Sequence, residues 1–409
     1  MRTEIHKKRI PLDGSGLVFA CINRYGVSNV FRITIALHSP IDAEKLASAY
    51  AETMEHFAPF KVKIKRGFFA YYFLPNENPV PKPIPDTTVC RKFVFNQNNR
   101  YLVRCLYTQN SFSLEFFHSL CDANSAAIFV KHLTAKYFGQ AMNGDLPISN
   151  DAKVNEDAYL RYANNASAGA LDIPKVYRFQ GEIADDKQLR VVRRSYKTED
   201  LLTVARKNGT TLSGYLAAVW AWAHYCAQKD AKTDSSAIRI ALPANLHKYF
   251  ATDSLRNFSL DISVTIPHKN EDYTFEQILD IAANTLKNNK NKDYLQKRIT
   301  SVNRLYRNFL YRFTPLFVKN VVAGVFFSYL SDRTISSVLS NLGSINFAPD
   351  IAENVDHAEF ILGPTLSKNP RCALVSHGNN IFIAVSSGKK ENIIEKTFFA
   401  FLSDYETSD

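Results

Sequence analysis

The sequence predicts an α/β protein of the α+β type with two lobes, in which mixed sheets are flanked by helices. One observation is length, because 409 residues exceed what a single hydrophobic core usually supports. Another is that strand-like and helix-like periods alternate in both halves of the chain. Between the halves, the stretch from Gly144 to about Pro174 is polar, rich in Ala and Asn, and without sustained period. We therefore expect an N-terminal lobe over 1–150, a crossover over 151–185 and a C-terminal lobe over 186–409.

The elements of the first half follow from alternation, helical spacing and turn residues. They are a strand at 30–37, a helix at 42–57, a hairpin at 61–73 and two strands at 101–108 and 111–117. Asp42 can cap the helix, Gly67 turns the hairpin, and Gln109-Asn110 joins the last two strands. Apolar residues recur every three or four positions from Ala126, which predicts a further helix. The segment "DGSG" at 13–16 is interpreted as a turn.

The second half repeats the pattern. Its predicted elements are a strand at 189–196, helices at 198–209 and 211–228, a strand at 236–242, a hairpin at 371–387 and a helix at 391–402. Two lobes of similar make-up follow from this repetition.

Composition limits the class of protein. Hydrophobic residues make up 46% and charged residues 22%, which is typical of a soluble globular chain. The basic N-terminus lacks the apolar run of a signal peptide, and the six cysteines are scattered singly, so we expect reduced thiols in a cytoplasmic protein. No cysteine pair has metal-ligand spacing, and we expect no metal. The G-x-S-x-G, G-x-x-x-x-G-K-[ST] and G-x-G-x-x-G motifs are absent, which argues against nucleotide binding through a Gly-rich loop.

An H-x-x-x-D spacing occurs three times, so the spacing alone is a weak signal. The three pairs are His38/Asp42, His118/Asp122 and His268/Asp272. Asp42 is better used as a helix cap, and the surroundings of His268 indicate a charged loop. Only His118 follows an apolar, aromatic strand and precedes a helix. The alternative for His118 is a core histidine that happens to have Asp122 as its partner.

Four segments in order resemble the chloramphenicol acetyltransferase-like superfamily, which includes alcohol acetyltransferases, plant acyltransferases and nonribosomal condensation domains. Along the chain they are "DAEKLASAYAETMEHFAPFKVKI" from Asp42, "SFSLEFFHSLCDANSAAIFVKHL" from Ser111, "LPANLHKYFATDSLRNFSL" from Leu242 and "LSNLGSI" from Leu339. The resemblance covers most of the chain and implies a two-lobed fold with a channel between the lobes.

The resemblance also implies residue roles. His118 is then the general base of an acyl transfer, and Asp122 holds the loop in shape through a basic residue of the second lobe. His247 stands where that basic partner is expected, and Arg256 is the substitute. A larger set is expected to line the substrate site: Ser340, Asn341, Asn257, Arg256 and His247. Ser340 and Asn341 could donate hydrogen bonds to an oxyanion, or could form a turn before Gly343.

Three positions depart from the superfamily pattern. Phe117 replaces a second histidine, Ala123 replaces the glycine that follows the aspartate, and His247 replaces an arginine. If neither His247 nor Arg256 reaches Asp122, a weakly active or degenerate member becomes a credible alternative, although the loss of the auxiliary histidine at 117 does not remove the base.

The formal charge of +11 is concentrated in part between Lys287 and Lys319. Such a run is commonly a solvated helix face. It could also face coenzyme A phosphates, an acidic carrier protein or a membrane surface, whereas no nucleic-acid-binding module accompanies it.

The function we expect is an acyltransferase that moves an acyl group from acyl-coenzyme A to a hydroxyl or amine. Coenzyme A serves as co-substrate, and no other cofactor is expected. One alternative is a condensation-type protein that uses carrier-bound acyl groups. The other is a catalytically degenerate two-lobed binding protein. The sequence indicates neither the acyl chain and acceptor nor the oligomeric state.

Overall fold

The computed structural model describes residues 9–23, 28–140, 155–164, 175–184, 189–231, 236–268, 272–308, 312–326 and 334–405. The strands form three sheets with the orders β1-β4-β3, β12-β2-β7-β6-β5 and β10-β9-β11-β13-β14-β8. Elements up to residue 140 are β1 (Ile10–Pro11), α1 (Gly14–Ile22), β2 (Val30–Leu37), α2 (Ala43–His56), β3 (Val62–Arg66), β4 (Tyr71–Pro75), β5 (Ile84–Pro85), β6 (Val103–Tyr107), β7 (Ser111–Phe117) and α3 (Ala123–Tyr137).

The later elements include the 20-residue helix α6. They are α4 (Ala158–Tyr162), β8 (Arg190–Lys197), α5 (Thr198–Lys207), α6 (Leu212–Ala231), β9 (Ile238–Asn245), β10 (Ser259–Ile266), α7 (Phe275–Asn289), α8 (Lys292–Arg307), α10 (Leu316–Phe326), β11 (Ser337–Ser344), α12 (Pro349–Ala352), β12 (Val355–Leu362), β13 (Arg371–His377), β14 (Asn380–Ser387) and α13 (Ile393–Phe401).

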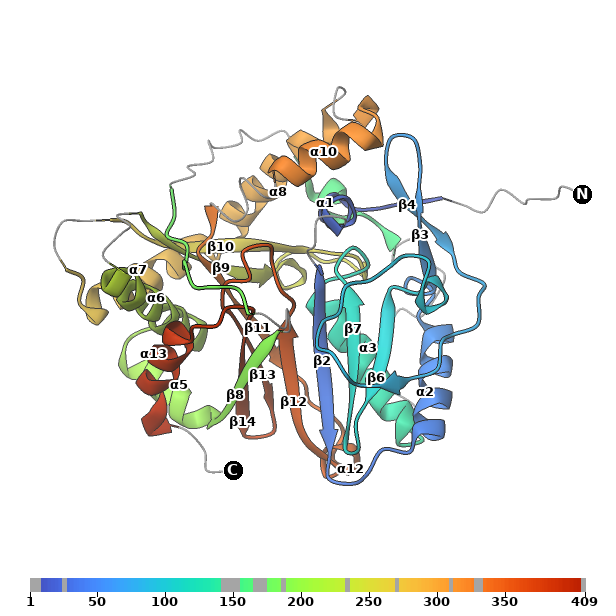
Figure 1. The fold of residues 1–409 in the computed structure, drawn as a ribbon, viewed down its shortest axis with the longest axis horizontal. Coiled ribbons are helices and arrows are strands. Elements are labelled where there is room, and N and C mark those ends of the chain that lie inside the picture. Colours follow the sequence, from blue (N-terminus) through green and yellow to red (C-terminus); the bar gives the residue numbers. More distant parts are fainter. Residues whose placement is uncertain are drawn as a thin grey trace, which may run out of the picture.

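The first lobe is built on the five-stranded sheet, with α3 packed on β2 and α2 packed on α3 (Figure 1). Its core combines these helices with the apolar residues of β2, β6 and β7, among them Ile33, Cys105 and Leu114. The hairpin of β3 and β4 forms a separate small sheet with β1. All of β2 is buried, including its polar residues Arg32 and Thr34.

The second lobe is built on the six-stranded sheet, whose two faces differ. Ile240, Leu242, Leu339 and Leu374 share a core with the helices α6 and α13. Residues of opposite parity, such as Val338 on β11, pack toward the core of the first lobe. Because strand side chains alternate between faces, one face of this sheet is directed at its own helices and the other at the first lobe.

The strand β12 joins the two lobes. It pairs antiparallel with β2 in the first lobe's sheet, and it contacts β13 and β14 of the second (Figure 1). An ion pair from Arg193 to Glu359 (2.8 Å) and a hydrogen bond from Ser386 Oγ to the carbonyl of Leu362 (2.7 Å) cross between the sheets. The expected assignment of all of 186–409 to the C-terminal lobe therefore needs a correction, since 355–362 complete the N-terminal sheet.

Most predicted elements are present with bounds within a few residues of those expected, including β2, α2, the β3–β4 hairpin and the β13–β14 hairpin. The turn interpretation of 13–16 is wrong, because Asp13 caps α1: its side chain accepts a hydrogen bond from the Gly16 N–H at 2.7 Å. The other alternative for Ser340 and Asn341, a turn before Gly343, corresponds to a local irregularity within the strand β11, where the register shifts between Asn341 and Ser344 and Gly343 has a φ of +86°. Of the predicted crossover over 151–185, residues 155–164 and 175–184 are described, and α4 lies within the first of these ranges.

All six cysteines are unpaired thiols. Within the described ranges, no helix combines the length and apolar character that a bilayer span requires.

Candidate functional site

His118 lies immediately after β7, where the strand leaves the sheet. Its backbone N–H donates to the carbonyl of Asn29 (2.8 Å), which extends the β2–β7 pairing by one step. The imidazole stacks on Phe19 of α1, with ring centroids 4.3 Å apart, and meets the ring of Phe31 edge-on at 5.1 Å. Two aromatic side chains from different elements thus fix the plane of the ring.

A chain of polar contacts fixes the edge of the imidazole that carries Nδ1. His118 Nδ1 lies 3.1 Å from Asn257 Oδ1, and Asn257 Nδ2 donates to Asp13 Oδ2 at 3.2 Å. Asn257 and Asp13 are each only 2% exposed. When Asp13 is ionised, the amide must turn its NH₂ group toward the carboxylate and its oxygen toward His118. This orientation requires a proton on Nδ1, so Nε2 carries the lone pair.

Burial lowers the pKa of His118 from its ordinary value of 6.5. The ring's contact with its own backbone carbonyl, the charge of Asp122 and the bond to Asn257 act in the opposite direction, whereas Arg371 lowers the pKa further. Loss of hydration penalises the charged imidazolium and outweighs the contacts that favour it. The imidazole is therefore neutral near pH 7, the state in which it can accept a proton.

Asp13 has the opposite shift. Burial raises the pKa of its carboxyl from 3.8 to about 7. The charge of Asp157 raises it as well, while the Gly16 N–H, Asn257 and the guanidinium of Arg256 lower it. A carboxyl with this pKa changes its charge near neutral pH, next to the amide that contacts His118.

Asp122 holds the junction of β7 and α3 by two backbone contacts. Its Oδ1 accepts from the Ser125 N–H (3.0 Å), which caps α3, and its Oδ2 accepts from the Phe258 N–H (2.9 Å) in the second lobe. The cross-lobe contact thus exists, but the expected partners, His247 and Arg256, are not the donors. The cross-lobe partner of Asp122 is the peptide N–H of Phe258, so this contact needs no basic side chain.

Arg256 and His247 have other neighbours. The guanidinium of Arg256 donates to Asn155 Oδ1 (2.6 Å) and lies over the ring of Phe73, 4.6 Å from its centroid. The ring of His247 meets Phe258 edge-on at 5.5 Å. Both therefore pack around the segment that carries Asn257, and neither contacts Asp122.

Ser340 and Asn341 point to opposite faces of β11. Asn341 Nδ2 donates to Ser213 Oγ on α6 at 3.1 Å, and its Oδ1 accepts from the Gly343 N–H at 2.8 Å. Asn341 is therefore engaged on the helix side of the sheet, which does not suit the expected oxyanion role. Ser340 shares a face with Val338 and Leu342, which pack toward the first lobe.

The departures at Phe117 and Ala123 have structural explanations. Phe117 is fully buried among aromatic rings, with Phe95 at 5.3 Å, so it belongs to the core. Ala123 is the first residue of α3, after its cap Asp122.

A cluster of charges near the site was missed by the sequence analysis. Arg239 and Asp261 share one face of the β9–β10 pair, because Asp261 is opposite Pro243 and Thr265 is opposite Arg239. Arg298 of α8 and Arg371 of β13 also interact electrostatically with Asp261. Burial raises the pKa of Asp261, while the positive charges of the arginines lower it. Because these residues lie far apart in sequence, no local pattern could have grouped them.

No family model and no curated protein matches the sequence. Solved structures do match over nearly the whole chain. TRI101 of F. sporotrichioides, complexed with coenzyme A and T-2, has a TM-score of 0.67 at 13% identity, covering 98% of this chain and 99% of that one. Polyketide synthase associated protein 5 from Mycobacterium tuberculosis has a TM-score of 0.61 at 12% identity, with 97% and 96% covered.

A condensation domain gives a similar result. The domain from Monacolin K polyketide synthase MokA has a TM-score of 0.60 at 10% identity, and the match covers 97% of this chain and 96% of that one. The architecture consists of two large sheets, of which the first is completed by β12 from the later part of the chain. The matched structures agree with this arrangement. The chain has the two-lobed fold of chloramphenicol acetyltransferase-like acyltransferases and condensation domains.

Proposed function

We propose that this protein is an acyltransferase that moves an acyl group from acyl-coenzyme A to a hydroxyl or amine, with His118 as general base. The observation that carries the proposal is the neutral imidazole whose Nδ1 is held by Asn257. A base at the end of a strand, next to a second lobe that supplies its positioning residue, suits transfer between two bound substrates.

In the proposed reaction, Nε2 of His118 takes the proton of the acceptor as its oxygen or nitrogen attacks the thioester carbonyl. The new C–O or C–N bond forms a tetrahedral intermediate, for which the hydroxyl of Ser340 is the candidate oxyanion donor. Breaking of the C–S bond then releases the thiolate, and the imidazolium returns the proton to sulfur. Asp122 acts only as a positioning residue in this scheme, through Ser125 and Phe258.

The ligands and the activity of two structural neighbours support this reaction class. TRI101 was solved with coenzyme A and T-2, and TRI3 is a trichothecene 15-O-acetyltransferase. The condensation domain of MokA supports the alternative, in which the donor is a carrier protein. The six unpaired cysteines suit a reducing compartment, and we propose the cytoplasm as the location.

Thiol release tests the proposal directly. The purified protein should release free thiol from one or more acyl-coenzyme A donors only when mixed alcohols or amines are added. If coenzyme A thioesters fail and carrier-loaded acyl groups react, the condensation-type alternative is correct. If no donor of either kind reacts, a degenerate binding protein is the better description.

The basic run supports a specific prediction about the donor. Lys297 and Arg298 are neighbours on α8, but Lys297 is exposed whereas Arg298 is half-buried and acts on Asp261 near the sheet. We propose that Arg298 contacts a phosphate of coenzyme A. Arg298→Gln should raise the KM for acyl-coenzyme A by roughly tenfold, the usual loss for a charge-assisted hydrogen bond.

The control is Lys297→Gln, which should leave this KM nearly unchanged. A donor without its 3′-phosphate should bind the unmodified protein less tightly, and added salt should weaken binding of the intact donor. Equal KM values for the intact and dephosphorylated donors would count against phosphate recognition.

The contacts of Asn257 support a prediction about pH. As Asp13 takes up a proton below about pH 7, it can donate to Asn257, and the amide loses its fixed orientation toward His118. We expect kcat/KM to rise with pH through about 7. In Asp13→Asn the titrating carboxyl is gone. The rise of kcat/KM with pH should then follow the lowered pKa of His118, below 6.5. The plateau should fall by at least about tenfold, since a wrong tautomer costs up to ~10⁴ in a catalytic triad.

The groups that face Asp13 are Asp157, Arg256, Tyr159 and Cys121, and none of them is altered in this test. Asparagine is also a good helix cap, so α1 keeps its N-terminal contact. Asp42→Asn, at the matching cap of α2, is the control and should change neither limb nor plateau. An unchanged pH profile in Asp13→Asn shows that Asp13 has a purely structural role.

A further inference from the structure

The helix α10 has its polar and apolar faces reversed. Lys319 and Asn320 face the protein and are 5% and 1% exposed, whereas Phe317, Val321 and Val322 are 59%, 53% and 56% exposed. A surface helix of a soluble protein normally turns its apolar stripe inward. The reversed orientation therefore leaves an apolar helix face in contact with solvent.

The ammonium of Lys319 explains how this orientation is held. It donates to the carbonyls of Phe69 (2.8 Å) and Arg312 (3.2 Å), and the Leu316 N–H donates to the carbonyl of Phe68 (2.7 Å). These bonds fasten α10 to the tip of the β3–β4 hairpin. Because Lys319 makes these hydrogen bonds, its side of α10 faces the protein. The opposite side of the helix therefore faces water.

The hairpin tip adds its own aromatic side chains to this face. Phe68 is 70% exposed and Phe69 is 41% exposed, and the ring of Phe69 lies 5.8 Å from that of Phe313. Together the exposed side chains form what we call the α10 patch, which consists of Phe68, Phe69, Phe313, Phe317, Val321 and Val322. Six of the ten large exposed hydrophobic side chains among the described residues belong to it. Such clustering marks an interaction site more than scattered exposure does.

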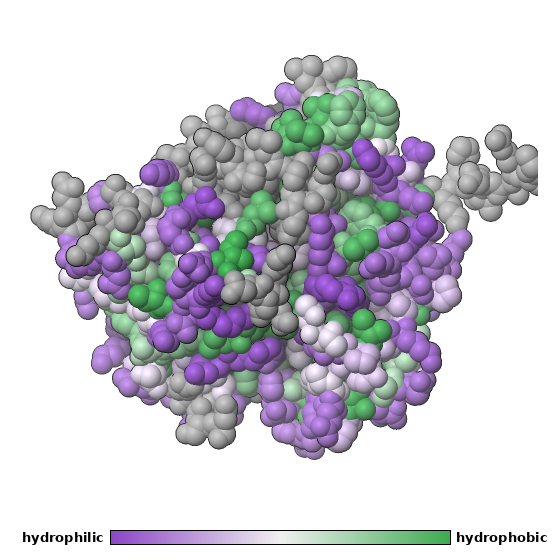
Figure 2. Space-filling view, in the orientation of Figure 1, coloured by the Kyte–Doolittle hydropathy of each residue, from purple (hydrophilic) through white to green (hydrophobic). Residues whose placement is uncertain are grey.

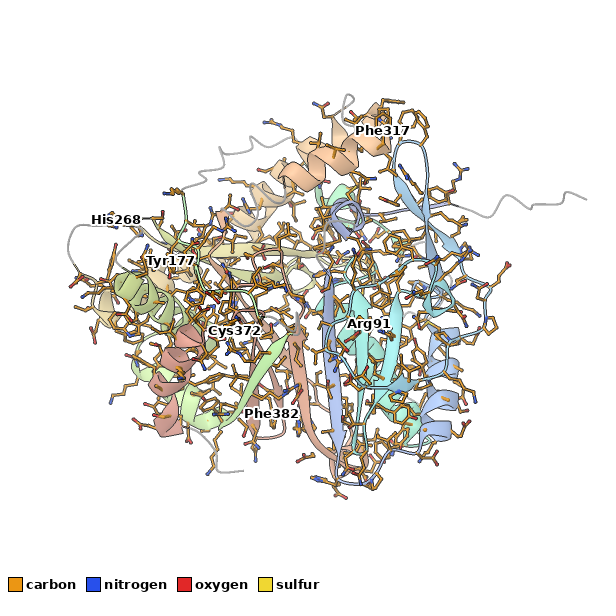
Figure 3. All side chains as sticks on the ribbon, in the orientation of Figure 1. Arg91, Tyr177, His268, Phe317, Cys372 and Phe382 are labelled. Atoms are coloured by element: carbon orange, nitrogen blue, oxygen red, sulfur yellow. The ribbon has the colours of Figure 1, made fainter. Side chains whose placement is uncertain are left out.

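The α10 patch projects from the molecule. The helix stands at the upper edge in Figure 1, apolar side chains cover it in Figure 2, and Phe317 lies at its outer end beside the hairpin in Figure 3. A projecting helix and loop tip suit insertion into a soft layer, whereas peptide partners are commonly held in grooves or along strand edges.

The charges beside the patch identify the kind of layer. Arg66 and Arg312 are exposed and lie within two residues of Phe68 and Phe313. The whole chain carries a formal +11. Aromatic side chains next to arginines are the combination that binds the interface of anionic membranes, where apolar burial and charge attraction act together.

We propose that the α10 patch binds the surface of an anionic lipid bilayer, with its phenylalanines inserted at the headgroup level. Binding is peripheral, in keeping with the finding that no described helix could span a membrane. The proposal does not depend on the acyl-transfer reaction, so either can fail alone.

Sedimentation with lipid vesicles tests it. The protein should bind vesicles of phosphatidylcholine mixed with phosphatidylserine, bind pure phosphatidylcholine less, and lose affinity as salt is raised. Phe317→Ser combined with Val321→Ser should weaken partitioning by at least about tenfold, because two inserted side chains are lost. Both positions are exposed, so folding and thiol release should be retained. Ile183→Ser is the matched control, since Ile183 is 48% exposed but lies outside the patch.

Three results would overturn the proposal. The unmodified protein could stay in the supernatant with both vesicle types, or the double variant could bind as well as the unmodified protein. The third is a concentration-dependent dimer in vesicle-free solution that the double variant abolishes, because a second copy of the chain would then cover the patch.

Discussion

Replacing His118 with alanine should lower the rate of acyl transfer by roughly 10²- to 10⁴-fold, the usual contribution of a positioned general base. The ring is held by Phe19, Phe31 and Asn257, so its function depends on these contacts rather than on spacing. The variant should stay folded, because His118 lies after the last residue of β7 and its backbone contact to Asn29 is kept. Thiol release, together with a melting curve, measures both effects.

The chain supplies its own controls in the two other H-x-x-x-D pairs. His38 and His268 are exposed, and Figure 3 shows His268 at the outer edge of the second lobe. Asp42 caps α2, as the sequence predicted, and Asp272 accepts from Lys229 and Tyr225 on the surface. Alanine at His38 or His268 should leave the rate nearly intact. Full activity of His118→Ala would remove the basis for the proposed mechanism.

Local sequence patterns predicted the elements of the site but not all of its contacts. The change from strand to helix period at His118 is local, and the structure places it between β7 and α3 as expected. The role of Asp13 was hidden because aspartate before glycine is typical of both turns and helix caps. The apolar run that follows Asp13 was the signal that could have distinguished them.

Contacts between distant segments were beyond any local pattern. β12 pairs with β2 across more than 300 residues of sequence, and periodicity does not indicate which strand is the partner. The same limit applies to Asp122, whose second-lobe partner is a peptide N–H and so has no side-chain signature. The family resemblance implied a basic partner and therefore pointed to His247 and Arg256.

Alternation also does not reveal buried charges, since polar residues of a strand usually face water. Arg32, Arg104 and Glu115 lie on three adjacent strands, and each is buried, with Glu115 fully so. Glu115 accepts from Arg32 Nη2 (2.6 Å) through one oxygen and from Arg104 Nε (3.1 Å) through the other. Arg32 also donates to Asp86 at 2.6 Å. Two guanidiniums and two carboxylates thus balance beneath the segment that carries Asp86.

Replacing Glu115 with glutamine should destabilise the protein by about 3 to 5 kcal/mol, because Arg104 then becomes a buried charge without a counterion. A urea denaturation curve measures the loss, and Glu199→Gln, which removes an exposed pair with Arg206, should cost no more than about 1 kcal/mol. Adding Arg104→Met to Glu115→Gln should recover part of the stability, since the excess charge is removed. Charge balance would not be the source of stability if Glu115→Gln unfolds at the same urea concentration as the unmodified protein. The same conclusion would follow if Arg104→Met only adds to the loss. Because Glu115 is three residues before His118 on the same chain segment, a destabilised β7 should also reduce transfer activity before the protein unfolds.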